Sequence, residues 1–221
     1  MSTQANLDNR LRLCAEFVRP DSRPADIGTD HAYLPVWLCR NGICPSAIAA
    51  DINPEPLKRG RETVVQAGMS GVVELRLSDG LSAIGEGEAD DIIIAGMGGE
   101  LIAKIIADCP YAKRGDLRFI LQPMTRSEAL IKYLCSEGFE IIRQDCCEAS
   151  GKVYTVLCVS FSGKPQPCGE LFPYTGRLKP AENEMHRRFI EKNISRLRKM
   201  AAGDEKYKAI ADRLEALCDN G

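Results

Sequence analysis

The chain has 221 residues, a mass of 24.3 kDa and a formal net charge of −2, with 44% hydrophobic and 27% charged residues. This composition excludes a disordered or fibrous chain, and the length allows one full domain with a small appendage. No apolar run approaches the roughly 20 residues of a membrane-spanning helix, and the first residues mix charges into their apolar positions, unlike a signal peptide. We therefore expect a cytoplasmic protein that does not bind membranes.

The positive charge is concentrated near the C-terminus. Residues 177–199 include eight basic and three acidic side chains, so the rest of the chain carries a net charge of about −7. A basic tail on an acidic body is typical of binding to a polyanion, although a solvated helix face that happens to be basic explains it equally well. The ten cysteines form no CxxC pair and no Cys–His cluster, so we expect buried thiols, no disulfide and no metal.

The first predicted element is a short amphipathic helix, because Leu7, Leu11, Cys14 and Val18 follow helical spacing. Short apolar segments then alternate with helical ones. The predicted strands are 25–28, 46–51, 72–77, 91–96 and 117–122, and the predicted helices between them are 33–41, 54–67, 99–108 and 127–137. This alternation predicts a mostly parallel sheet that is covered on both faces.

Two further strand-like runs, 139–148 and 152–162, are separated by only three residues. That gap is too short for a crossover helix, so the two runs predict an antiparallel hairpin. Five parallel strands closed by such a hairpin make the seven-stranded, Rossmann-like α/β arrangement of class I methyltransferases. A dinucleotide dehydrogenase would be expected to continue with another helix and a parallel strand.

The C-terminal part has a different pattern. Residues 164–176 are rich in proline and glycine and predict a linker. Beyond them, two heptad-spaced apolar series on either side of Gly203 predict an antiparallel helical hairpin. We therefore expect a Rossmann-like catalytic domain over 1–163, a linker over 164–176 and a helical hairpin over 177–221.

The strongest local motif is DIGTDHAYLP at residues 26–35, at the end of the first predicted strand, where doubly wound sheets bind ligands. Gly28 allows the backbone to turn and to approach a ligand closely. The GxGxxG pattern of a pyrophosphate site is absent. Asp26 before the turn suits a ligand with a cationic amino group, such as the methionine part of S-adenosylmethionine. The alternative is an ordinary strand-to-helix turn with Asp30 as the helix N-cap.

Acidic residues follow the next two strands. Asp51 closes the second predicted strand, where a carboxylate can accept both ribose hydroxyls of a nucleoside, although a surface aspartate is equally consistent with the sequence. Asp79 and Gly80 follow the third strand, where adjacent residues commonly meet an adenine ring. By themselves these two residues are also accounted for by a simple turn.

The fourth strand ends in AGMGGE at residues 95–100. Three glycines in four residues bare the backbone where class I methyltransferases face the transferable methyl group, unless they serve only tight helix–strand packing. Gln122 and Pro123 end the fifth strand at the same rim and offer a polar contact. His31 in the first turn is a tempting base, but a structural or cofactor-gating role is the preferred interpretation.

Six blocks of the sequence, in this order, resemble the bacterial tRNA (adenine-22-N1)-methyltransferase family. They are ADIGTDHAYLP (25–35), AIAADI (47–52), RLSDGL (76–81), IIIAGMGGELI (92–102), FILQP (119–123) and KVYTVLCV (152–159). The family also ends in a coiled-coil hairpin. This sequence has Asp51 where the family usually has Glu, and Met124 where it usually has Asn.

The resemblance implies that S-adenosyl-L-methionine donates its methyl group to N1 of a tRNA adenine, with Asp30 as the catalytic carboxylate. It implies cofactor binding by Asp26, Gly28, Thr29, His31, Asp51, Ile52, Asp79, Gly80, Gly96, Met97 and Gly98. It implies substrate binding by Tyr33, Gly99, Gln122, Pro123, Arg187, Arg188 and Lys192.

Three other functions stay open. They are methylation of another RNA site or of a small molecule, a regulatory nucleotide-binding module without catalysis, and an NAD-linked oxidoreductase, which the missing glycines and the closing hairpin disfavour. We expect a monomer that binds tRNA and needs no metal, although the sequence does not exclude a dimer.

Overall fold

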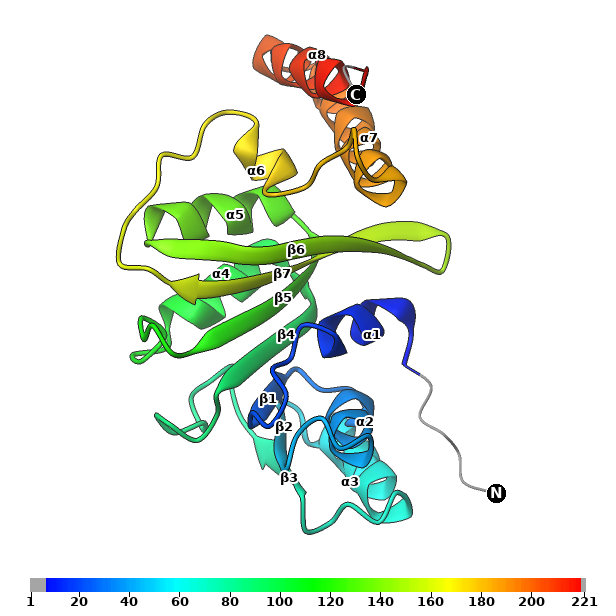
Figure 1. The fold of residues 1–221 in the computed structure, drawn as a ribbon, viewed down its shortest axis with the longest axis vertical. Helices are drawn as coiled ribbons and strands as arrows, with labels where there is room; N and C mark the ends of the chain where they lie inside the picture. The colour runs from blue at the N-terminus through cyan, green and yellow to red at the C-terminus, as the bar shows by residue number, and fades with distance from the viewer. Residues whose placement is uncertain (1–6, 220–221) are drawn as a thin grey trace.

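A computed structural model describes residues 7–219 and shows one mixed sheet of seven strands in the order β3-β2-β1-β4-β5-β7-β6 (Figure 1). Strands β1 to β5 are parallel to one another, whereas β7 runs antiparallel to both β5 and β6. The predicted fold class is therefore confirmed. The strands are β1 Pro24–Ile27, β2 Ala47–Asp51, β3 Val73–Leu77, β4 Asp91–Gly98, β5 Arg118–Thr125, β6 Phe139–Ala149 and β7 Lys152–Phe161.

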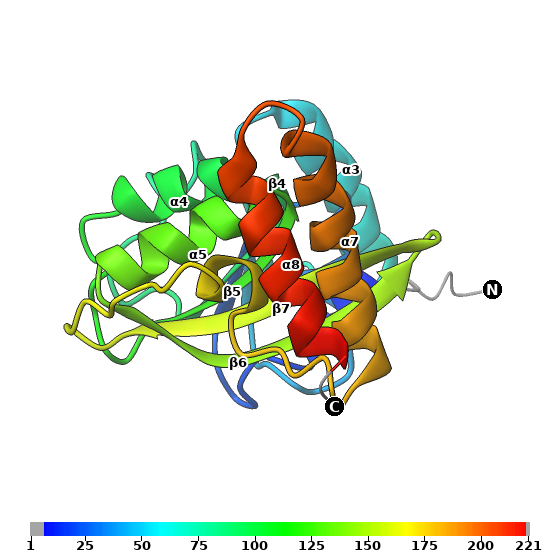
Figure 2. The same ribbon diagram turned by 90° about the horizontal axis from the view of Figure 1, so that it is seen from above.

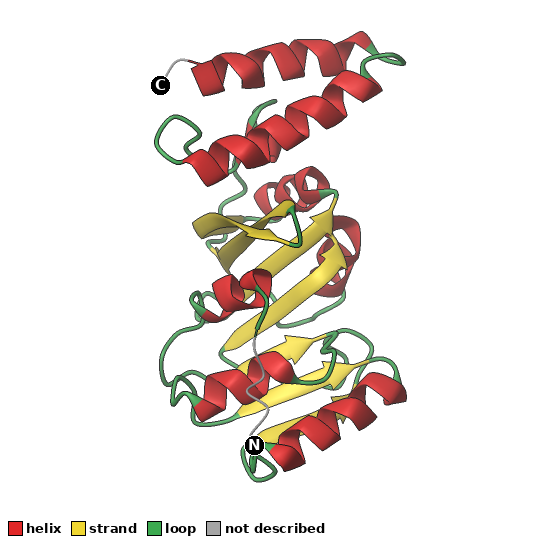
Figure 3. Cartoon of the chain, turned by 90° about the vertical axis from the view of Figure 1, so that its right-hand side faces the viewer, coloured by secondary structure: helices red, strands yellow, loops and turns green. Residues whose placement is uncertain are grey.

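Helices cover both faces of the sheet, as the layered view in Figure 3 shows. Two apolar clusters join one face to α1, α2 and α3, and a third joins the other face to α4 and α5. The helices are α1 Asn9–Ala15, α2 Tyr33–Arg40, α3 Pro54–Gln66, α4 Gly99–Ala107, α5 Ser127–Ser136, α6 Phe172–Thr175, α7 Glu184–Met200 and α8 Glu205–Asp219.

The position of β4 in the middle of the sheet explains why its sequence is continuously apolar. Ile92, Ile93 and Ile94 are all fully buried. Because side chains alternate along a strand, Ile93 packs with α1 and α2 while Ile92 and Ile94 pack with α4 and α5. This burial on both faces fixes β4 in the middle of the sheet and places its glycine-rich end at the rim.

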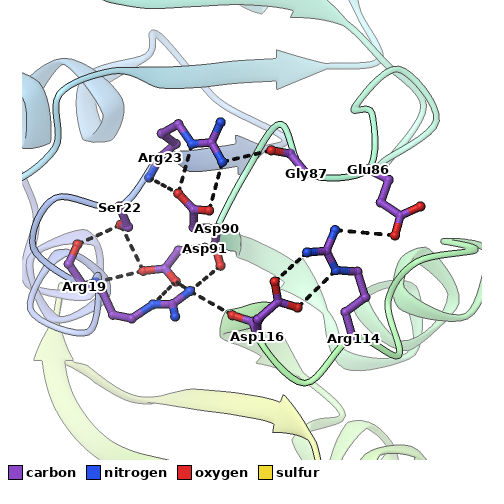
Figure 4. A network of polar contacts seen from close by, with 9 residues as sticks. All are labelled: Arg19, Ser22, Arg23, Glu86, Gly87, Asp90, Asp91, Arg114 and Asp116. Atoms are coloured by element: carbon purple, nitrogen blue, oxygen red, sulfur yellow. Dashed lines mark hydrogen bonds and ion pairs between the residues drawn. The ribbon is translucent and has the colours of Figure 1, made fainter.

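At the opposite, N-terminal end of β4, a buried ion pair anchors the loop after α1 (Figure 4). The Asp91 carboxylate is fully buried and accepts hydrogen bonds from the Arg19 backbone N–H and Nε, both at 2.8 Å, and from the Ser22 hydroxyl at 3.2 Å. A buried carboxylate needs such partners, since an unpaired one would be very costly.

The C-terminal helices α7 and α8 lie side by side above the β6–β7 hairpin (Figure 2) and form the predicted antiparallel pair. Their apolar faces share one buried cluster with Cys146 of β6 and Val153 of β7. The segment expected to be a linker includes the short helix α6, with Pro173 in its first turn, where the fixed φ of proline is compatible with a helix. All ten cysteines carry free thiols.

Candidate active site

A cavity of about 600 Å³ lies at the carboxyl ends of the parallel strands. One wall consists of the turn after β1 and the ends of β2 and β3, and the other consists of α4 and the segment that follows it. Six residues singled out in the sequence line this cavity: Gly28, Asp51, Ile52, Asp79, Gly80 and Met97.

The turn after β1 depends on Gly28. Its φ of +77° is a conformation that side-chain-bearing residues rarely adopt, and a Cβ at this position would lie 2.1 Å from Cε of Met97. The Gly28 and Thr29 N–H groups donate to the Ala50 carbonyl at 2.8 and 3.0 Å, which ties the turn to β2. The bare backbone of this turn therefore forms part of the cavity wall, with Met97 packed over it.

Two polar groups are buried behind this turn. Burial raises the pKa of Asp26 to about 6, and the nearby Asp51 carboxylate adds to the shift. The Thr29 hydroxyl lies near the Asp26 carboxyl but has no partner in hydrogen-bonding geometry among residues 7–219. A buried hydroxyl without a partner is rare, so this corner of the site fits a polar ligand group.

The end of β2 supplies a fixed carboxylate, and Ile52 together with Leu101 of α4 supplies uncovered apolar surface. Oδ1 of Asp51 accepts the Asn53 N–H at 2.7 Å, which holds the carboxylate in place at the cavity. Ile52 and Leu101 line the same cavity with 57% and 49% of their surfaces exposed. A fixed carboxylate beside uncovered apolar surface is suited to a nucleoside, which offers ribose hydroxyls and a flat base.

Beyond Gly28, the rest of the turn between β1 and α2 lies beside the cavity rather than in its wall. His31 and Ala32 have φ values of +61° and +54°, a strained backbone of the kind that clusters at functional sites. The His31 and Tyr33 rings stack, with centroids 5.0 Å apart. The exposed Asp30 carboxylate places Oδ1 3.2 Å from Arg59 Nη2 and 3.5 Å from His31 Nε2. Asp30 caps no α2 backbone N–H, because the N-cap position is Ala32.

At the β4–β5 rim, Gln122 is fully buried and its amide is already engaged. Oε1 accepts hydrogen bonds from the Gly96 N–H and from Arg10 Nη1, both at 3.1 Å, while Nε2 donates to the Pro123 carbonyl at 3.1 Å. Gln122 therefore orders the rim through these hydrogen bonds. Gly99 serves packing, since a Cβ there would lie 2.3 Å from the Arg126 carbonyl oxygen.

The basic residues of α7 have partners within the chain. Arg187 donates to the Cys218 carbonyl, and Arg188 pairs with Glu148 at 2.6 Å. Lys192 Nζ donates to the Val153 carbonyl at 2.7 Å. Much of the positive charge of this segment therefore docks the helical hairpin on β6 and β7.

The described residues, 7–219, contain no helix long and apolar enough to cross a membrane. They also contain no group of three or more His, Cys, Asp or Glu side chains that could hold a metal ion.

Comparison with known proteins identifies the family of this chain. The methyltransferase-domain family matches residues 7–157. The chain is also 33% identical to the tRNA (adenine(22)-N(1))-methyltransferase of Bacillus subtilis (strain 168), over 97% of this chain and 96% of that protein. The chain belongs to the tRNA (adenine(22)-N(1))-methyltransferase family.

Solved structures of this methyltransferase family share the whole fold. The Bacillus subtilis m1A22 tRNA methyltransferase TrmK has a TM-score of 0.81 and 31% identity, with 97% of this chain and 98% of that chain covered. Sp1610 of Streptococcus pneumoniae, solved with S-adenosyl-L-methionine, has a TM-score of 0.82 and 30% identity over 97% and 99% of the two chains. TrmK of M. capricolum, solved with S-adenosyl-homocysteine, has a TM-score of 0.77 and 25% identity over 97% of each chain.

Sequence reasoning missed two parts of this methyltransferase site. The first is the α4 wall, where Leu101, Lys104, Ile105 and Asp108 line the cavity with the 3-1-3 spacing of one helix face, a signal that was present in the sequence. The second is Arg10, which reaches the rim from α1. No local pattern marks an arginine whose partner lies 112 positions further along the chain.

Proposed function

We propose that this chain transfers the methyl group of S-adenosyl-L-methionine to N1 of adenine 22 in tRNA. The observation that carries the proposal is the cavity at the strand ends, in which the bare Gly28 turn and the Asp51 carboxylate line the same space. Membership of the methyltransferase family supports the reaction, and the activity for which the B. subtilis relative is named supports the acceptor.

The residues of the cavity fit this cofactor, which supplies an electrophilic methyl group on a sulfonium ion. Asp51 would accept the ribose hydroxyls, while Ile52, Asp79 and Gly80 would enclose the adenine. On the β1 side, Asp26, Gly28, Thr29 and His31 hold or cover the amino-acid part, where the Thr29 hydroxyl finds the partner it lacks. Gly96, Met97 and Gly98 form the strand end next to the methyl group.

The chemistry needs positioning more than a strong base. N1 of neutral adenine has a free lone pair at pH 7, and its methylation produces a cation. A carboxylate near the acceptor stabilises that developing charge, and we assign this role to Asp30. The contacts of Asp30 to Arg59 and His31 both use Oδ1, so Oδ2 faces no partner within the described part of the chain.

The acceptor adenine must leave its stack to expose N1, which lies on its base-pairing edge. Eversion costs a few kcal/mol, and stacking on the exposed Tyr33 ring at the rim would offset part of this cost, whereas Gly99 and Pro123 are buried. The helical hairpin over 177–221, following the linker 164–176 and the catalytic domain 1–163, would hold the tRNA backbone. We place this grip chiefly at Lys192, which donates to the Val153 carbonyl but forms no ion pair within residues 7–219. By contrast, Arg188 is neutralised by Glu148, and Arg187 is tied to α8.

The test is methylation of an unmodified tRNA transcript that contains adenine 22, with S-adenosyl-L-methionine as donor. We expect 1-methyladenosine by nucleoside mass spectrometry and a primer-extension stop at position 22. The matched control is the same transcript with guanine at position 22, which should stay unmethylated. Methyl transfer to that control, or only to a small molecule, would establish a different acceptor.

A further inference from the structure

Three side chains from distant parts of the chain meet beside the candidate active site. They are Arg10 of α1, Tyr154 of β7 and Lys192 of α7. The guanidinium carbon of Arg10 lies 5.5 Å from the Tyr154 ring centroid, and Nζ of Lys192 lies 5.1 Å from the same centroid. Figure 1 shows how this happens, because the tip of the β6–β7 hairpin extends between α1 and α7.

This cluster adjoins the acceptor side of the site. Nη1 of Arg10 shares the Gln122 oxygen with the Gly96 N–H, and it lies 4.0 Å from where a Cβ of Gly96 would be. The next residue, Met97, lines the cavity on its other side. Arg10 therefore stands over the glycine-rich end of β4, one residue away from the cavity.

The N-terminal turn of α1 fixes the direction of Arg10. Asp8 caps the helix, since its Oδ1 accepts the backbone N–H groups of Arg10 and Leu11 at 2.9 and 3.0 Å. Its other oxygen accepts from Arg10 Nη2 at 2.6 Å. The guanidinium is thereby turned back across the rim, with 21% of the side chain still exposed.

One of the two cations of the cluster, Lys192, has no carboxylate partner in the described part of the chain, whereas Arg10 pairs with Asp8. Lys192 donates to a backbone carbonyl and forms no ion pair with a carboxylate of residues 7–219. Burial lowers the pKa of Lys192, and the neighbouring cations Arg196 and Lys152 lower it further. An anion arriving here would pair with Lys192 and would also meet Arg10, whose Nη2 is held by Asp8 while its Nη1 faces the rim.

We propose that Arg10 and Lys192 form a two-cation clamp over Tyr154 that holds the tRNA phosphates flanking the everted adenine. The inference rests on the proposed function and deepens it. When a base enters the cavity its own backbone stays at the mouth, and phosphates are the anions of that backbone. Contacts to phosphates fix register and orientation without reading sequence, which is what an in-line methyl transfer requires.

The experiment uses Arg10→Met, Lys192→Met and the double variant, because methionine keeps an aliphatic stem but no charge. The dissociation constant of the unmodified tRNA transcript is measured between low and moderate KCl, together with the KM for tRNA. Each single variant should weaken tRNA binding roughly three- to tenfold. The slope of log association constant against log KCl concentration should fall in magnitude by about one in each single variant and by about two in the double variant. The cofactor dissociation constant should not change.

Matched controls are Arg12→Met on α1 and Lys208→Met on α8, both exposed cations without a side-chain partner in the described chain. They should bind tRNA with the wild-type slope. Arg10→Lys and Lys192→Arg keep the positive charge and should therefore show the wild-type salt slope. A merely structural role for either side chain would not predict this result. If Arg10→Met fails to fold, the salt slope of the Lys192→Met variant, at an exposed position, tests the proposal alone.

An unchanged salt slope in a folded Lys192→Met protein, or an equal loss in the controls, would overturn the clamp. This outcome is distinct from failure of the proposed function, in which the wild-type protein itself leaves adenine 22 unmethylated.

Discussion

At the scale of single residues, two aspartates near the turn after β1 have different surroundings. Asp26 is buried behind the Gly28 turn, whereas Asp30 stands exposed at the strained turn that follows. In the proposed function the first carboxyl serves the cofactor and the second serves the acceptor, and each one makes a separate prediction.

Replacing Asp30 with Ala should lower turnover by on the order of 100-fold, since one electrostatic contact to the developing charge is lost. Cofactor affinity should change little, because Asp30 lies outside the cavity lining. Single-turnover methylation of tRNA and calorimetric titration of the cofactor measure the two effects. Full turnover in the folded variant would remove Asp30 from the mechanism.

Asp26 predicts a pH dependence of stability. Its pKa rises from the usual 3.8 to about 6 on folding, so between these values the folded chain holds a proton that the unfolded chain has released. Stability should therefore fall as pH rises through this window, by on the order of 2–3 kcal/mol. Urea unfolding between pH 4 and 7 checks this, with Asp26→Asn as the comparison that should flatten the slope.

At the scale of elements, the sequence predicted the strands and helices well where their periodicity was strong. The run of Ile92 to Ile94 identified the central strand because only a strand buried on both faces is continuously apolar. The glycine and aspartate motifs located the cavity because carboxyl ends of parallel strands meet at one edge.

What the sequence did not predict depends on contacts between distant residues. The composition of 164–176 indicated only a linker, and the short helix α6 inside it packs against α5 and α7. Likewise, the basic pattern of α7 indicated an RNA-binding face. The ion pair of Arg188 with Glu148 depends on how the hairpin docks, which no local pattern encodes.

The buried pair at the start of β4 predicts a large difference between two neighbouring arginines. Arg19→Met would leave the fully buried Asp91 carboxylate unpaired and should cost about 3–5 kcal/mol of unfolding free energy. Arg23→Met removes an exposed pair with Asp90 and should cost less than about 1 kcal/mol. Chemical denaturation of the two variants tests this; equal losses would show that burial does not decide the cost.

At the scale of the whole molecule, several ion pairs join the helical hairpin to the catalytic part, and one of them has a largely buried carboxylate. Arg196 of α7 pairs with the largely buried Glu128 of α5 at 2.8 Å. Arg196→Met should loosen the docking by about 1–3 kcal/mol, because Glu128 then loses this partner. Arg198→Met is the matched control, since Arg198 pairs with Asp212 and Glu215 inside the hairpin.

Hydrogen exchange along α7 and α8 reports on this docking. The Arg196 variant should exchange faster across both helices under conditions where β4 stays protected, while the Arg198 variant should leave the contact with α5 intact. Unchanged exchange in the Arg196 variant would show that its ion pair with Glu128 does not contribute to holding the hairpin.

The most direct test of the central claim is a crystal structure of the protein with S-adenosyl-homocysteine. The account predicts the ribose hydroxyls on Asp51, the amino-acid part along the Gly28 turn and the sulfur facing the end of β4. Binding anywhere else, or a Met97 side chain that still covers Gly28 at saturating ligand, would contradict it.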